Sequence, residues 1–188
     1  ERAAKDIRVG RCGSTLLFYY QPDTVQAWGG AKYNKWLGTT VAYGLGHSAK
    51  DQPPDKLEEK FAYIVGASVL VTEEFLKEIG LMTEDYFLYF EELDWAIRAK
   101  ERFCLAYAPG SLVYHKEGGT TGGGQDPVQR SKISDYWSIR NRILFTKRYF
   151  PFTLPTVYLG LIVAILNRIR RCQWDRVGMI IKHMLALY

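Results

Sequence analysis

Apolar and turn-forming residues alternate over the first part of the chain, in the short runs that β-strands favour. Residues 7–30 predict two short strands around a Gln-Pro-Asp turn at 21–23, the second richer in β-forming residues. Residues 31–60 show little periodicity and contain several glycines and a Pro-Pro pair, so we predict a long surface loop. Loops of that length inside compact domains are usually functional or mobile. Residues 63–71 predict a buried strand.

Helix and strand patterns then alternate. Residues 72–79 predict a helix that has Thr72 as its N-cap and ends at Gly80. Residues 91–102 predict a second helix, and the two short strands expected between 104 and 115 are separated by a Pro-Gly pair. The segment EGGTTGGGQDP that follows contains five glycines. Local preference gives such a segment no fixed conformation, and we expect it to move.

The remaining chain is predicted to be helical. Pro127 is expected to open a long helix. Its apolar face is predicted to comprise Ile133, Tyr136, Trp137, Ile143 and Leu144. Residues 149–167 then form a run of 19 residues without a charge, about 28 Å long as a helix and close to the ~30 Å hydrocarbon thickness of a bilayer. Two prolines restrict the strongly helical part to 156–166, about 17 Å, which is too short to span.

Beyond this run, apolar residues recur at spacings of 3, 4, 3 and 4. They are Trp174, Val177, Ile181, Met184 and Tyr188. Two helices that lie on the cytoplasmic face of a membrane would explain both the apolar run and this amphipathic stripe. Two alternatives remain: the helices pack on each other or on another domain, or a single helix spans the bilayer.

Composition and charge narrow the choice of partners. The content of 47% hydrophobic and 14% aromatic residues is typical of a folded protein. Three widely separated cysteines indicate reduced thiols in a cytosolic compartment. The net charge of +5 is uneven, because residues 128–188 carry +9 and the preceding ones −4. A basic tail favours an anionic partner, a membrane or a nucleic acid. Nucleic acid is disfavoured, because the apolar stretch 156–166 would have no role in binding it.

Both ends suggest a piece of a longer protein. The opening ERAAKDIR contains no signal peptide and no initiator Met, and the last predicted helix reaches the final residue.

The densest chemistry lies in YFLYFEELDWAIRA, residues 86–99, where aromatics surround Glu91, Glu92 and Asp94 at the start of a predicted helix. A carboxylate beside apolar surface loses solvation, which raises its pKa and makes it a better proton acceptor. The helix dipole, in contrast, lowers the pKa of an acidic residue at the N-terminus of a helix. The alternative to a catalytic role is therefore a solvated, capped first turn, and for Asp94 a structural ion pair with Arg98 four residues on.

Three segments, VGASVLVTEEFLKEIGLMTEDYFLYFEELDWAIRA, SLVYHKEGGTTGGG and YWSIRNRILFTKRYFP, follow one another in a fixed order. Together they resemble the C-terminal half of family 2 glycosyltransferases, particularly the rhamnosyltransferase-like members with the GT-A fold, over residues 5–150. The resemblance implies an α/β fold. Residues 1–126 would form the acceptor and base part of a Rossmann-like, mixed-sheet GT-A domain. From the apolar pattern and the charge, residues 127–188 are expected to be a basic, helical, membrane-associated tail.

The resemblance also implies a reaction. The enzyme would be an inverting transferase that moves a sugar from a nucleotide-sugar donor to a saccharide or lipid-linked acceptor in cell-surface polysaccharide synthesis. It would act at the inner face of the plasma membrane. The base would be Glu92, with Glu91 beside it. Relatives often carry Asp at this position, so Glu lengthens the arm by one methylene.

Further site residues follow from the same resemblance. His115, 23 residues after Glu92, matches a histidine that helps hold Mg or Mn on the diphosphate. Its alternative is an ordinary core or surface histidine. Gly66, Ala67 and Ser68 are candidates to line the acceptor site, or else to permit tight strand packing. Trp95 would either stack on a sugar or fill the core, and Asp94 beside it is a further candidate to bind the substrate. The glycine-rich segment would close over the nucleotide.

Two absences from the sequence complete the prediction. The QxxRW motif of processive synthases does not occur, which favours addition of a single sugar. The Asp-x-Asp of the family's donor half is also missing, so we expect this chain alone to be inactive. The alternative function is a non-catalytic, membrane-associated scaffold.

Overall fold

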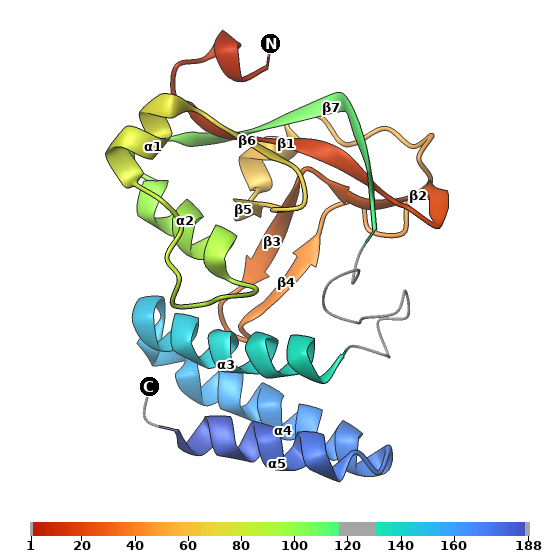
Figure 1. The fold of residues 1–188 in the computed structure, drawn as a ribbon, viewed down its shortest axis with the longest axis vertical. Coiled ribbons are helices and arrows are strands. Elements are labelled where there is room, and N and C mark those ends of the chain that lie inside the picture. Colours follow the sequence, from red (N-terminus) through yellow and green to blue (C-terminus); the bar gives the residue numbers. More distant parts are fainter. Residues whose placement is uncertain (1, 117–130, 187–188) are drawn as a thin grey trace. The chain divides into compact units, whose positions relative to one another are not determined.

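The computed structural model describes residues 2–116 and 131–186. Within these residues the protein is a mixed α/β structure with one mixed sheet, a small second sheet and five α-helices (Figure 1). The described residues form two compact units. The first contains both sheets, and the second contains the C-terminal helices together with two short segments, 34–39 and 86–90.

The larger sheet is organised around β1 (Val9–Phe18). On one edge, β7 (Cys104–His115) runs parallel to it over almost its full length. On the other edge, β6 (Val69–Val71) pairs antiparallel with residues 11–13, and β2 (Gln21–Trp28) pairs antiparallel with residues 15–18. β1 is almost completely buried, as expected for the central strand of a covered sheet.

The predicted strand pattern needs several corrections. The turn lies at residues 19–20, and the Gln-Pro-Asp sequence opens β2 instead of forming the turn. The two strands predicted between 104 and 115 are one strand, β7, in which a bulge at 109–111 accommodates the Pro-Gly pair. The buried strand predicted at 63–71 is divided by a turn into β5 (Tyr63–Ile64) and β6.

The predicted surface loop at 31–60 is also partly wrong. It contains most of β3 (Gly30–Asn34) and all of β4 (Thr39–Ala42), which form the small sheet in the order β4-β3-β5. A short 3₁₀ helix, η2 (Leu57–Lys60), ends this region, and another, η1 (Ala3–Lys5), precedes β1. Gly29, with a φ of 72°, turns the chain between β2 and β3, which lie in different sheets.

The helix predicted at 72–79 is confirmed as α1 (Glu73–Ile79). The Thr72 hydroxyl accepts a hydrogen bond from the Phe75 N–H, and Gly80 ends the helix with a φ of 79°. The second predicted helix is confirmed as α2 (Glu91–Ala99), slightly shorter than expected. Phe75, Trp95 and Ala99 form an apolar cluster that joins α1 and α2.

The helical unit contains α3 (Lys132–Tyr149), the 3₁₀ turn η4 (Pro151–Thr153), α4 (Leu154–Arg170) and α5 (Trp174–Leu185). The three α-helices pack side by side around Ile139, Ile143, Leu161 and Ile180 (Figure 1). The glycine-rich segment and Pro127, which was expected to start α3, lie outside the described residues.

The predicted apolar faces of these helices are only partly correct. On α3, Ile133 and Tyr136 are exposed, while the polar Asp135, Asn141 and Thr146 are buried. On α5, the buried positions are Val177, Ile180 and His183, and Trp174 and Ile181 of the predicted stripe are exposed. Buried polar groups on α3 find hydrogen-bond partners within the unit, and hydrophobic periodicity cannot anticipate such partners.

Candidate functional site

Glu92 is the centre of the candidate site. It occupies the first turn of α2 and is half-buried. The Gly66 N–H donates a hydrogen bond to its carboxylate. Gly66 has no side chain, and a Cβ at this position would collide with Glu92 Oε1. Gly66 and Ala67 are themselves exposed, so the carboxylate lies just beneath a surface that small residues leave open.

The electrostatics of Glu92 favour a proton acceptor active near neutral pH. Burial, followed by the neighbouring Glu91 carboxylate, raises the pKa of Glu92 to about 7. Hydrogen bonds from the main-chain N–H groups of Glu92 and Gly66, and the charge of Arg11, act in the opposite direction. Burial raises the pKa of nearby Tyr63 to about 12, and the two carboxylates add to the effect, so this phenol remains protonated.

Arg11 is a functional candidate that the sequence prediction missed. Its guanidinium lies over the rings of Phe75 and Trp95, 5.3 Å from each centroid, and its Nη1 donates to the Glu92 carbonyl oxygen at 3.1 Å. The side chain is 1% exposed. Within the described residues its Nε and Nη2 have no hydrogen-bond partner. Burial lowers the pKa of Arg11 to about 10, so the residue is cationic at neutral pH. Its hydrogen bond to the Glu92 carbonyl holds the start of α2 in place.

Asp94 and Trp95, which were predicted near the substrate, are both buried. The Asp94 carboxylate accepts a hydrogen bond from Arg98 Nε at 2.8 Å, which confirms the predicted i,i+4 ion pair. Arg98 also donates to the carbonyls of Ile79 and Leu81, so the pair ties α2 to the end of α1. Trp95 donates from Nε1 to the Gly80 carbonyl at 2.9 Å and packs edge-on against Phe75. Both contacts correspond to the structural alternatives.

The predicted glycine-alanine-serine segment connects the site to the large sheet. Ser68 donates to Ser14 on β1 at 2.9 Å, and Ser14 lies at 2.9 Å from Ser111 on β7. This chain of hydroxyls fixes the end of the segment opposite Gly66. Ser68 thus packs against the sheet, which agrees with the structural alternative, and Gly66 packs directly against the Glu92 carboxylate. That the segment lines an acceptor site stays a prediction.

His115 lies elsewhere on the same sheet. It pairs with Phe18 at the end of β1, whereas Arg11, which contacts Glu92, is seven residues earlier on that strand. Seven extended residues span about 23 Å between Cα atoms. The structure therefore does not bring His115 into contact with the carboxylates. Its Nδ1 lies 2.8 Å from Gln26 Oε1, within hydrogen-bond distance.

A metal site would need more ligands than these residues supply. In the described parts of the chain, no three His, Cys, Asp or Glu side chains come together. His115 could offer a cation one ring nitrogen, since an imidazole whose other nitrogen is hydrogen-bonded is a common metal donor. The remaining ligands would have to come from elsewhere.

A second feature that the sequence did not reveal precedes α2. In the segment 86–90, Phe87, Tyr89 and Phe90 have φ values of 61°, 66° and 74°, a left-handed conformation that costs free energy for residues other than glycine. The buried Asn141 amide donates to the carbonyls of Tyr86, Leu88 and Tyr89 at 2.7 to 3.1 Å and holds this segment in place. A lone Asn within a helix gives no such signal in the sequence.

One hollow in the first unit is separate from the carboxylates. It has a volume of about 590 Å³ and is open to solvent. Its lining residues are Trp28, Tyr43, Gly44, His47, Asp51, Gln52, Pro54 and Leu57. His47 Nδ1 lies 3.2 Å from Asp51 Oδ2 at its edge. None of these residues was predicted to belong to a site.

The arrangement around Glu92 can accept a proton from a hydroxyl that approaches over Gly66 and Ala67. A carboxylate with a pKa of about 7 is ionised in a large fraction of molecules at neutral pH and is still basic enough to take that proton. No protein-family model and no curated protein sequence matches the chain.

Proposed function

We propose that this chain carries the acceptor-activating half of an inverting glycosyltransferase. The enzyme transfers a sugar from a nucleotide-sugar donor to a saccharide or lipid-linked acceptor, and Glu92 is its general base. The observation that supports this most is the carboxylate of Glu92, which combines a pKa of about 7 with a position directly against the exposed Gly66. The mixed sheet, in which β1 and β7 are parallel, is compatible with the C-terminal portion of a GT-A domain.

In this proposal the protein's residues perform three tasks. Glu92 takes the proton of the acceptor hydroxyl as the oxygen attacks the anomeric carbon from the face opposite the leaving diphosphate, which inverts the configuration. Glu91 keeps the pKa of Glu92 high, and Arg11 fixes the main chain that carries it. Gly66 orients the carboxylate through its N–H, and its lack of a side chain leaves room for the Glu92 carboxylate itself.

Stabilisation of the leaving group is assigned to residues outside this region. A divalent cation, Mg or Mn, would neutralise charge on the departing diphosphate. In the proposal, His115 supplies one ligand through Nε2, and an Asp-x-Asp in a separate donor-binding part supplies the others. No Asp-x-Asp occurs in the sequence, so this chain by itself should bind a sugar nucleotide weakly.

The experiment combines residues 1–188 with a donor-binding part that carries Asp-x-Asp. A panel of nucleotide sugars that includes dTDP-rhamnose is supplied, and release of nucleoside diphosphate is measured. Glu92→Gln should reduce kcat by about 10²- to 10⁴-fold, the usual contribution of a general base, and leave the donor KM nearly unchanged. The control is Glu101→Gln, an exposed carboxylate just beyond α2, which should retain full activity. Undiminished turnover by Glu92→Gln would exclude this residue as the base.

A further inference from the structure

Helix α4 is apolar on two faces, of which only one is covered within its unit. Val157 and Leu161 are completely buried, and Leu161 packs with residues of α3 and α5. Large apolar residues at spacings of three and four follow the opposite face. They are the exposed Leu159, Ile162, Val163, Leu166 and Ile169. A soluble helix normally presents polar residues on that face, so this stripe needs a partner.

Helix α5 extends the same surface. Its exposed apolar residues are Trp174, Ile181 and Leu185, of which Trp174 is 63% and Leu185 77% exposed. Tyr158 of α4 donates from its hydroxyl to the Met184 carbonyl at 3.3 Å, so the flank of α5 next to Met184 borders α4. Ile181, three residues before Met184, lies near that flank, and Leu185 and Trp174, four and seven residues from Ile181, share its exposed side of α5. We refer to these three residues and the five of α4 as the hairpin face.

The charges around the hairpin face are almost all positive. Arg170 and Arg171 are exposed where α4 ends, and Lys182 is exposed beside Ile181 on α5. Within residues 131–186, the acidic side chains are Asp135, which is buried, and Asp175, which is paired with Lys132. An apolar surface with a cationic margin and a peripheral Trp matches the interface of an anionic bilayer, where apolar groups enter the acyl region and arginines meet lipid phosphates.

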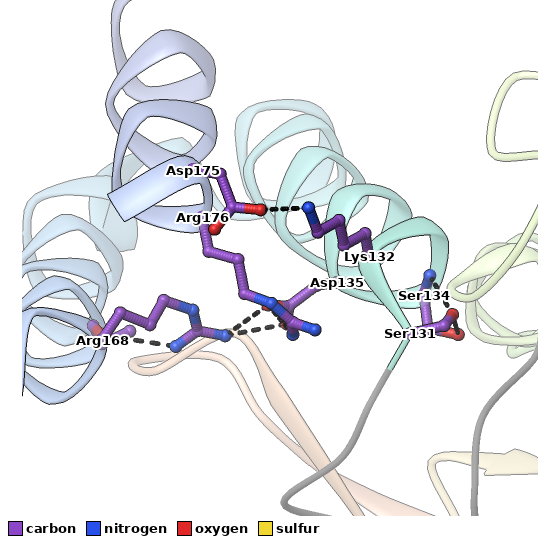
Figure 2. Close-up of polar contacts among 8 residues, drawn as sticks. Ser131, Lys132, Ser134, Asp135, Arg168, Asp175 and Arg176 are labelled. Carbon is purple, nitrogen blue, oxygen red and sulfur yellow. Dashed lines mark hydrogen bonds and ion pairs between the residues drawn. The ribbon is translucent and has the colours of Figure 1, made fainter. Parts of the chain in front are cut away.

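The buried side of α4, opposite the hairpin face, determines whether the helix can span a membrane or lie on its surface. Arg168 donates to both Asp135 oxygens at 2.8 Å, and Arg176 of α5 donates to Asp135 Oδ2 at 2.9 Å (Figure 2). By length and composition, residues Pro151–Arg170 could cross a bilayer, with a mean hydropathy of 1.6. Such a crossing would separate Arg168 from Asp135 and expose Val157 and Leu161, which is unfavourable for a buried, hydrogen-bonded ion pair. A helix lying along the surface keeps these contacts.

We propose that the hairpin face binds the surface of an anionic lipid bilayer, with α4 and α5 parallel to the membrane plane at the boundary between headgroups and acyl chains. This inference does not depend on the proposed transferase chemistry. It applies equally to a catalytic and a non-catalytic protein.

The test is co-sedimentation of the complete chain with vesicles. Vesicles of phosphatidylcholine with about one third phosphatidylglycerol should bind the protein, and pure phosphatidylcholine vesicles should bind it much less. Ile162→Glu and Leu166→Glu should each weaken binding by about tenfold or more, because each removes a buried apolar side chain and adds a charge of the wrong sign. Arg170→Glu combined with Arg171→Glu should reduce binding to the anionic vesicles. The matched control is Ile133→Glu, on an exposed apolar residue of α3 outside the hairpin face, and it should bind as the wild type does.

Further measurements distinguish a helix that lies on the bilayer from one that spans it, and a lipid partner from a second copy of the chain. In vesicles with brominated lipids, bromines near the headgroups should quench the fluorescence of Trp174, and the Trp174→Phe variant identifies which part of the signal comes from this residue. Alkaline carbonate should release the protein from the vesicles. Retention after carbonate, with quenching at the bilayer centre, would show a spanning helix and overturn the proposal. Absence of vesicle binding would overturn it as well. If sedimentation then shows a dimer that Ile162→Glu dissociates, a second copy of the chain covers the face instead. Circular dichroism confirms that each variant is folded.

Discussion

Glu92 links the candidate chemistry to the stability of its unit. Its pKa in the folded protein, about 7, is above the ordinary value of 4.5, so the folded state favours the protonated form. This contribution to stability is complete below about pH 4.5 and is lost as the pH rises through about 7. Glu92→Gln, which cannot ionise, should therefore be more stable than the wild type by about 3 kcal/mol at pH 8 and nearly equal to it at pH 4. Chemical denaturation at the two pH values measures the difference, and Glu101→Gln should show none. An equal effect at both pH values would contradict the assigned pKa.

The neighbours of Glu92 should shift its titration in opposite directions. Glu91→Gln removes a negative charge that raises the pKa of Glu92, and the titration should move to lower pH. Arg11→Met removes a positive charge that lowers it, and the titration should move to higher pH. The measurement is NMR of the ¹³C-labelled Glu92 carboxyl group over a pH series. Shifts in the same direction for both variants would show that structural rearrangement, and not charge, controls the titration.

At this scale the sequence allowed part of the site to be predicted. Acidic residues among aromatics at a helix start form a local pattern, which made Glu91, Glu92 and Asp94 candidates together. The choice of Glu92 as the base came from the resemblance and stays a prediction. The Asp94–Arg98 pair could be found because its partners are four residues apart. Arg11 could not, since it contacts Phe75, Trp95 and Glu92, all distant in sequence. A single arginine within an apolar strand was the one available signal, because a buried cation needs partners.

Among the elements, the packing of α3, α4 and α5 depends on one buried carboxylate. Asp135 binds Arg168 of α4 and Arg176 of α5, so one α3 side chain connects all three helices (Figure 2). Asp135→Asn should destabilise the helical unit by about 3 kcal/mol, because it removes the negative charge that Asp135 supplies to two largely buried arginines. Asp175→Asn is the matched control. This residue forms an exposed pair with Lys132, and its loss should cost less than about 1 kcal/mol. Thermal unfolding measures both, and equal effects would contradict the special role of Asp135.

The elements themselves were predictable where the signal was local. Thr72 and Gly80 bound α1 through a cap and a left-handed glycine, and both can be read from the sequence. The face of α3 could not be predicted, because Asp135 and Asn141 are buried through partners on other segments. The strands β3 and β4 were missed for a related reason. They are short, glycine-flanked and half exposed, and their pairing to one another and to β5 gives little periodicity.

For the whole molecule, the division into two units predicts which distant segments respond together. The helical unit includes residues 34–39 and 86–90 as well as the C-terminal helices. Thr156 donates to the Trp36 carbonyl, and Asn141 donates to carbonyls of the second segment, so each segment is held by a helix far from it in sequence. Destabilising the helices should therefore expose amides in both segments.

Hydrogen exchange of Asp135→Asn tests this coupling. The amides of Gly38 and Leu88, which are hydrogen-bonded within their own segments, should exchange faster together with those of α3, α4 and α5. Amides of β1 and β7 belong to the other compact unit and should retain wild-type rates. If Gly38 and Leu88 instead kept the rates of β1, the two segments would belong with the sheets. The boundary between the units would then follow the sequence division near residue 126, because the segments would be connected to the helices only by contacts that do not stabilise them.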